Sequence, residues 1–126
     1  MGGGTVTARE AIFHVCKRAE WDAAEREGVY RGSSQDAADG FIHFSSRVQV
    51  AASVGKHRKG QADLVLVSVD AARVSGALRW EPSRGGQLFP HLYGVLSLSA
   101  VIRIDPLPLG PDGHHVFPAG FTGAAS

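Results

Sequence analysis

The segment LVLVSV, Leu64–Val69, is rich in β-branched residues and almost continuously apolar. A strand with one face in water alternates apolar and polar residues, so this run predicts a central strand buried on both faces. Shorter strands are predicted before and after it in the sequence, at Ala11–Cys16, Phe41–Ser45, Leu78–Glu81, Leu88–Tyr93 and Ala100–Ile104.

Two helices are predicted in the N-terminal half of the chain. The first spans Lys17–Glu27, and Gly28 suits its terminating position. The second spans Arg47–Lys56, and a single helical turn is expected at Gln35–Ala38. An apolar stripe of the second helix should face the core: Val48, Ala51, Ala52 and Gly55. Helices come early and strands late, which favours an α+β fold over a doubly wound parallel sheet.

Length and composition narrow the choice of protein class. The 126 residues carry a net charge of +1, so we do not expect nucleic acid as a partner. No apolar run approaches a membrane span, and the segment MGGGTVTARE has no apolar signal core, so we expect a cytoplasmic protein. We also expect a monomer. The lone Cys16 excludes an internal disulfide. Residues 8–118 are expected to form one domain, with loosely structured ends at 1–7 and 119–126.

Polar side chains interrupt four of the predicted strands. Period-two alternation puts three pairs on shared faces: His43 with Ser45, Arg79 with Glu81, and His91 with Tyr93. His14 interrupts the first strand, and a histidine is costly to bury without a partner. We therefore expect a shared polar cleft in which the imidazoles of His14 and His43 lie within about 12 Å of each other. Pro90 cannot donate a ladder hydrogen bond, which predicts an edge strand or a bulge around His91.

Four segments together resemble a small, uncharacterised bacterial family, catalogued as domain of unknown function 952. They are IFHVCKRAEW, DGFIHFS, LRWEP and FPHLYGVL, in this order, and they fall within Ala11–Leu107. A second resemblance is more distant. Ile12-Phe13-His14 and Ile42-His43-Phe44-Ser45 are similar in order and spacing to motifs of RNA 2′-phosphotransferases and ADP-ribosyltransferases.

The second resemblance implies an ADP-ribosyltransferase-like fold, with a split, mixed β-sheet whose cleft holds NAD or an ADP-ribosylated substrate. His14 would bond a ribose hydroxyl there, and His43 and Ser45 would line the same cleft. Val15 and Cys16 stand where those families have Gly-Thr, and the sequence has no Glu-x-Glu motif.

These observations lead to a first hypothesis, that the protein binds a nucleotide-type ligand similar to NAD or ADP-ribose. No cofactor is identified, and NAD is a possible substrate. If the protein is an enzyme, it would be a transferase acting at a ribose C1′. The candidate catalytic residues are His14, His43 and Glu81, where Glu81 would stabilise an oxocarbenium-like charge. The candidate ligand-binding residues are Ser45, Arg79, His91 and Tyr93, where Arg79 would hold a phosphate.

Two alternatives stay open. One is a metal-dependent hydrolase that uses His14, His43 and His91, because three imidazoles can hold zinc and leave a water position. The other is a non-catalytic module that binds a small molecule or a protein.

Overall fold

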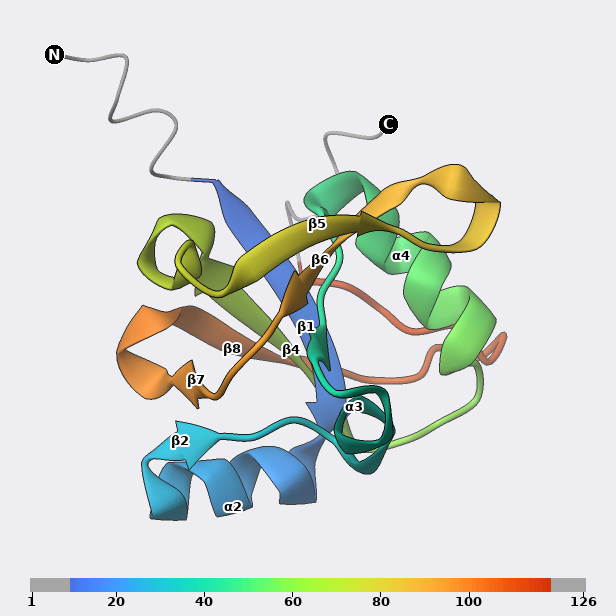
Figure 1. Cartoon of the computed structure of the whole chain (residues 1–126). Coiled ribbons are helices and arrows are strands. Elements are labelled where there is room, and N and C mark those ends of the chain that lie inside the picture. Colours follow the sequence, from blue (N-terminus) through green and yellow to red (C-terminus); the bar gives the residue numbers. More distant parts are fainter. Residues whose placement is uncertain (1–9, 119–126) are drawn as a thin grey trace, which may run out of the picture.

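The computed structural model describes residues 10–118 (Figure 1). The two ends expected to be loosely structured, 1–7 and 119–126, lie outside this range. The helices and strands, in chain order, are β1 (Ala11–Lys17), α2 (Arg18–Glu27), β2 (Val29–Tyr30), α3 (Ser34–Asp39), β3 (Ile42–His43), α4 (Arg47–His57), β4 (Leu64–Asp70), β5 (Leu78–Pro82), β6 (Leu88–Leu92), β7 (Leu96–Ser97) and β8 (Val101–Leu107). Short 3-10 turns lie at Ala71–Val74, Arg84–Gly86 and Leu98–Ala100.

The strand β4 is the middle strand of a three-stranded sheet with the order β1-β4-β8. Its residues from Leu64 to Val69 are all buried, which confirms the prediction from the LVLVSV pattern. Alternate side chains enter two separate apolar clusters, one around Val67 and Ile12 and the other around Leu66 and Phe13. Each such buried aliphatic side chain contributes roughly 1.5–3 kcal/mol to stability, so this strand anchors the core on both sides.

A second sheet has the order β3-β6-β5, and β2 pairs separately with β7. The strand that contains Pro90 and His91 is therefore central, and the prediction of an edge strand is wrong. The carbonyl of Pro90 accepts a hydrogen bond from the Phe44 amide at 3.0 Å. Proline has no N–H to return that bond. The sheet accommodates the proline because β3 ends there, after only two paired residues.

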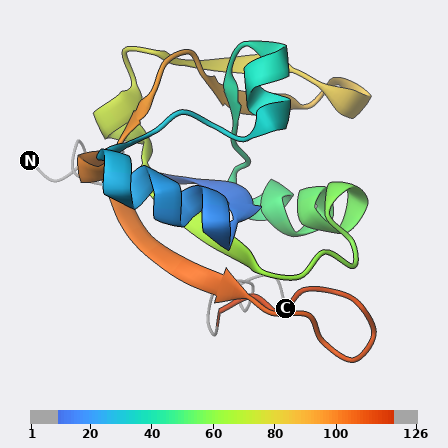
Figure 2. The same ribbon diagram turned by 90° about the horizontal axis from the view of Figure 1, so that it is seen from below.

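All strand pairings within residues 10–118 are antiparallel. The predicted α+β class is confirmed, whereas the expected mixture of parallel and antiparallel pairs is wrong. The strands are nevertheless divided among separate sheets. In Figure 2 the β5–β6 ribbon runs along one side of the molecule and β8 along the opposite side, with β1 and α4 between them.

The buried face of α4 differs from the predicted stripe. Val50 and Val54 pack into the cluster that contains Phe13 and Leu66, whereas Val48 is 90% exposed. Val50 and Val54 lie four residues apart and so share a helix face. Two valines bury more apolar area than the alanines and glycine of the predicted stripe, and burial scales with apolar area. The helix is therefore rotated relative to the sequence prediction.

The strand β1 links the two larger sheets. Besides its ladder with β4, it exchanges two backbone hydrogen bonds with Ser45, two residues after the end of β3. The Phe13 amide donates to the Ser45 carbonyl and the Ser45 amide donates to the Phe13 carbonyl, both at 2.8 Å. His14 and His43 are brought together by this bridge.

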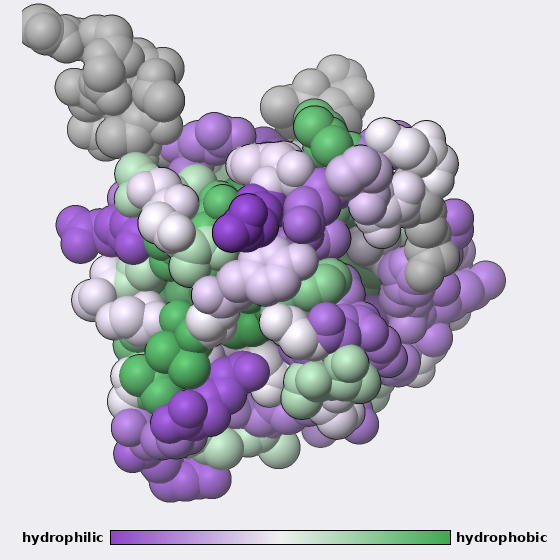
Figure 3. Space-filling view, in the orientation of Figure 1, coloured by the Kyte–Doolittle hydropathy of each residue, from purple (hydrophilic) through white to green (hydrophobic). Residues whose placement is uncertain are grey.

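Exposed apolar side chains are scattered over the described surface. Figure 3 shows hydrophilic residues over α2 and on the α4 side, and a hydrophobic patch beside β7. No helix within residues 10–118 is long and apolar enough to cross a membrane.

Candidate functional site

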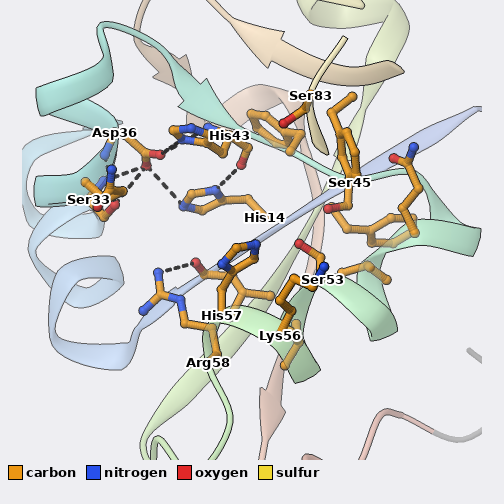
Figure 4. Close-up of a pocket in the computed structure, with 18 of the residues that line it drawn as sticks. His14, Ser33, Asp36, His43, Ser45, Ser53, Lys56, His57, Arg58 and Ser83 are labelled. Carbon is orange, nitrogen blue, oxygen red and sulfur yellow. Dashed lines mark hydrogen bonds and ion pairs between the residues drawn. The ribbon is translucent and has the colours of Figure 1, made fainter. Parts of the chain in front are cut away.

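A cleft of about 1020 Å³ lies among β1, α3, β3, α4 and β6 (Figure 4). Binding pockets for small molecules span about 300–1,000 Å³, so this cleft is large enough for a nucleotide-sized ligand. Four residues predicted from the sequence line it: His14, His43, Ser45 and His91. The other three predicted residues, Arg79, Glu81 and Tyr93, are not among the lining residues.

The carboxylate of Asp36, on α3, is the centre of the polar network beside the cleft. Its Oδ1 accepts hydrogen bonds from the Nδ1 and the amide of His43, at 2.6 and 3.1 Å. Its Oδ2 accepts from the amide and the hydroxyl of Ser33, at 2.8 and 3.1 Å. Burial works to raise the pKa of Asp36, but the hydrogen bond from His43, the nearby His14 and the Ser33 amide outweigh it and hold the pKa at about 2.

The local sequence explains why this carboxylate turns inward. Ser33 caps α3, and Ser33 and Asp36 form a reciprocal capping box. Gly32 precedes them at a φ of 96°, a conformation that glycine adopts without steric cost. A Cβ at position 32 would lie 2.8 Å from the Cβ of Asp36, so the backbone approaches the aspartate as closely as a glycine permits.

His14 is buried and both of its ring nitrogens are engaged within the protein. Nδ1 lies 2.6 Å from the carbonyl oxygen of His43, which can only accept, so Nδ1 carries the proton. Nε2 lies 2.7 Å from the hydroxyl of Tyr30. Burial lowers the pKa of His14, against the opposing effect of Asp36. In the neutral ring Nε2 therefore accepts from Tyr30, and His14 holds the backbone of β3 in place.

Burial also shifts the pKa of two side chains near His14. It raises the pKa of the Cys16 thiol to about 12 and raises the pKa of the Tyr30 hydroxyl as well. Both groups therefore stay protonated at neutral pH, and Cys16 is a buried core residue rather than a nucleophile.

His43 is half-buried and lies between two carboxylates. Besides the contact of Nδ1 with Asp36, its Nε2 lies 3.0 Å from Oδ2 of Asp39, the last residue of α3. The Nε2 of His14 lies 3.7 Å from Oδ2 of Asp36. Because both imidazoles contact the same carboxylate, the predicted separation of within about 12 Å is confirmed. Neither Asp36 nor Asp39 was selected from the sequence.

A second carboxylate–histidine pair joins two neighbouring strands, with Glu81 on β5 and His91 on β6. Oε1 of Glu81 accepts from Nδ1 of His91 at 2.8 Å and from the Tyr93 hydroxyl at 2.7 Å. These hydrogen bonds, that of His91 first, lower the pKa of Glu81. The Phe41 ring stacks on His91 with centroids 4.0 Å apart. The guanidinium of Arg79 lies 5.6 Å from the Tyr93 ring centroid, so Arg79 points to this cluster.

Basic side chains line another part of the cleft. They are Lys17 and, from the end of α4 and the residue that follows it, Lys56, His57 and Arg58. The carboxylate of Glu20, which accepts from the Lys17 amide, also lines the cleft. Arg58 is held in place because its guanidinium donates to the Val15 carbonyl at 3.2 Å and to Gln61 at 3.1 Å. Figure 4 shows Lys56, His57 and Arg58 below His14, His43 and Asp36 in this view.

The described residues do not assemble the predicted trio of metal ligands. No group of three or more His, Cys, Asp or Glu side chains within residues 10–118 is arranged to hold a metal ion. His14 in particular has a protein partner at each ring nitrogen.

Fold and cleft together define a small α+β protein with antiparallel sheets and a polar cleft lined by carboxylate, imidazole and cationic side chains. The chain belongs to the protein family of unknown function DUF952, whose model matches residues 15–104. This match confirms the first resemblance drawn from the sequence.

Solved structures of a relative agree with the family match. The crystal structure of protein CC0527 from Caulobacter crescentus is 46% identical, with a TM-score of 0.81 over 84% of this chain and 93% of that one. Its solution NMR structure is 47% identical, with a TM-score of 0.75 over 82% of this chain and 90% of that one. No curated protein matches the chain. The resemblance to ADP-ribosyltransferases is not shown by these matches and stays a prediction.

Proposed function

We propose that the cleft binds a phosphorylated small molecule of the nucleotide type, such as NAD or ADP-ribose. The observation that carries the proposal is one cleft of about 1020 Å³ whose lining combines two unlike groups of side chains. One group supplies positive charge and the other supplies carboxylate and imidazole groups. A nucleotide has the matching polarity, with phosphates at one end and ribose hydroxyls at the other.

The basic side chains suit a phosphate group. Lys17 and Lys56 are exposed and extend into the cleft lining, while Arg58 adds a positive charge that is fixed by the Val15 carbonyl. Charge-assisted hydrogen bonds to phosphate are about twice as strong as neutral ones. The net charge of only +1 therefore conceals a local cationic surface.

The acidic side chains suit hydroxyl groups. Asp39 is about 38% exposed and its carboxylate can accept from a ribose hydroxyl, with His43 beside it. Asp36 already accepts four hydrogen bonds from the protein and so acts by orienting His43. If a transferase reaction at ribose C1′ occurs, as the resemblance implies, Asp39 beside His43 is a better candidate carboxylate than Glu81, which lies outside the cleft lining.

Ligand-induced stabilisation tests the proposal. We expect millimolar ADP-ribose, NAD or ADP to raise the melting temperature, since a ligand at one hundred times its Kd adds about 2.7 kcal/mol. Lys56→Gln should weaken ADP-ribose binding about tenfold by removing one charge-assisted contact. Arg103→Gln is the matched control, because Arg103 pairs with Asp105 on β8, away from the cleft. Absence of a shift with all three nucleotides would rule the proposal out and leave the non-nucleotide binding module as the better hypothesis.

A further inference from the structure

His43 and His91 are direct neighbours across the β3–β6 ladder. Their ring centroids are 5.6 Å apart in an edge-on arrangement, and both residues line the cleft. Each ring is fixed from behind by a carboxylate on Nδ1, at 2.6 Å from Asp36 for His43 and at 2.8 Å from Glu81 for His91.

The two rings differ in what their second nitrogen faces. His43 has a carboxylate oxygen beside each nitrogen, and both nitrogens can donate to those oxygens only when both carry a proton. His91 donates Nδ1 to Glu81, which lies outside the cleft lining, while the His91 ring itself lines the cleft. With the proton on Nδ1, the lone pair of a neutral His91 is on Nε2. A His43 that donates to both carboxylates carries a proton on Nε2, so the pair can supply a proton acceptor and a proton donor.

We propose that His91 and His43 act as general base and general acid in the hydrolysis of a nucleotide phosphodiester, which rests on the proposed nucleotide binding. A water molecule attacks the phosphorus while Nε2 of His91 takes its proton. The bond from phosphorus to the leaving oxygen breaks, and Nε2 of His43 gives that oxygen its proton in place of the contact with Asp39. Solvent then removes one proton from His91 and returns one to His43.

A phosphodiester suits the pair for two reasons. Its hydrolysis needs one proton removed from the nucleophile and one delivered to the leaving oxygen, on opposite sides of a single phosphorus atom. Lys17, Lys56 and Arg58 line the same cleft, so they favour the entry of an anionic ester over a neutral one. Glu81 and Asp36 are positioning residues in this scheme, because each acts through a histidine. Phe41, stacked on His91 and 4.6 Å from the His43 ring centroid, fixes the planes of both rings.

Two esters of thymidine 5′-phosphate separate the two roles. In the p-nitrophenyl ester the leaving group departs without a proton, whereas in the methyl ester it needs one. We expect His43→Gln to lower the hydrolysis of the methyl ester about 10²–10⁴-fold, the usual contribution of a general acid, and to affect the p-nitrophenyl ester far less. His91→Gln should lower the hydrolysis of both esters, because both reactions need the base.

Two further variants guard against a folding artefact. His114→Gln is the matched control, since His114 is 60% exposed, contacts Asp112 and is not among the residues that line the cleft, and it should leave both rates unchanged. Glu81→Gln removes the carboxylate that orients His91 at a side chain that is 35% exposed. It should lower kcat on both esters with little change in KM, and its melting temperature verifies that it folds.

The outcomes distinguish this proposal from the proposed binding. ADP-ribose binding without hydrolysis of either ester overturns the catalytic proposal alone. An equal loss on both esters in His43→Gln, in a folded variant, overturns the assignment of His43 as the acid. Failure of every nucleotide to bind, together with no hydrolysis, overturns both.

Discussion

Replacement of Asp36 by asparagine should be among the most damaging single changes near the cleft. Asparagine has the same shape, but its NH₂ group would face donors from Ser33 or His43 that now point at a carboxylate oxygen. Hydrogen bonds to a charged group are worth about 1.5–3 kcal/mol, and a buried donor left unsatisfied costs a similar amount. We expect Asp36→Asn to lower the free energy of unfolding by about 2–4 kcal/mol at pH 7.

The effect should depend on pH in a defined direction. The pKa of Asp36 is about 2 in the folded protein against an ordinary value of 3.8. The folded state therefore binds fewer protons than the unfolded chain in this range, and protonation favours unfolding. The ionised carboxylate contributes about 2 kcal/mol, fully present above about pH 4 and lost as the pH falls toward 2. The gap between wild type and Asp36→Asn should narrow over that range.

Urea denaturation of both proteins at pH 7 and at about pH 3 measures this gap. Asp39→Asn is the matched control, because Asp39 contacts the same imidazole from the same helix but is 38% exposed. An exposed pair of this kind contributes at most about 1 kcal/mol. A gap for Asp36→Asn below about 0.5 kcal/mol, or one that is equal at both pH values, would refute the central role of this carboxylate.

Three further predictions concern the core and its titrating groups. Val54→Ala should cost roughly 2 kcal/mol of stability in urea denaturation, whereas Val48→Ala should change stability by no more than about 0.5 kcal/mol. A larger loss for Val48→Ala than for Val54→Ala would support the helix face predicted from the sequence. Cys16, with a pKa of about 12, should not react with an aromatic disulfide reagent at pH 8 until urea unfolds the chain, and rapid labelling of the native protein would contradict its burial. Burial lowers the pKa of His14 below its ordinary 6.5, so the unfolded chain binds more protons and wild-type stability should fall as the pH drops below 6.5. In His14→Gln this part of the pH dependence should disappear; an unchanged pH profile would mean that His14 is not the group responsible.

The sequence predicted the features that depend on a regular period. The run Leu64–Val69 is buried on both faces as expected, and the alternation in Phe41–Ser45 correctly directs His43 toward the cleft. Side-chain period alone did not determine the rotation of α4. Val50 and Val54 compete with Val48 for the core, and the choice depends on the cluster around Phe13, which is contributed by a distant strand.

Asp36 was missed because its importance is non-local. The spacing Ser33-x-x-Asp36 is a capping-box pattern, so the sequence held a signal for the start of α3. It held none for the burial of the carboxylate, which requires His43 from β3 and His14 from β1 to meet it. The location of Pro90 was misjudged for a similar reason. A proline excludes one hydrogen bond but does not reveal whether a neighbouring strand has already ended.

The two hydrogen bonds between Phe13 and Ser45 have a consequence for motion. They join β1 to the segment that follows β3, so movement of these two segments apart must break them. Hydrogen exchange of these two amides can be compared with that of Val67 in the middle of β4, which reports global unfolding. If Phe13 and Ser45 exchange much faster than Val67, the cleft opens while the core stays folded. If all three exchange at one rate, the cleft is rigid, and a ligand enters it without displacing either sheet.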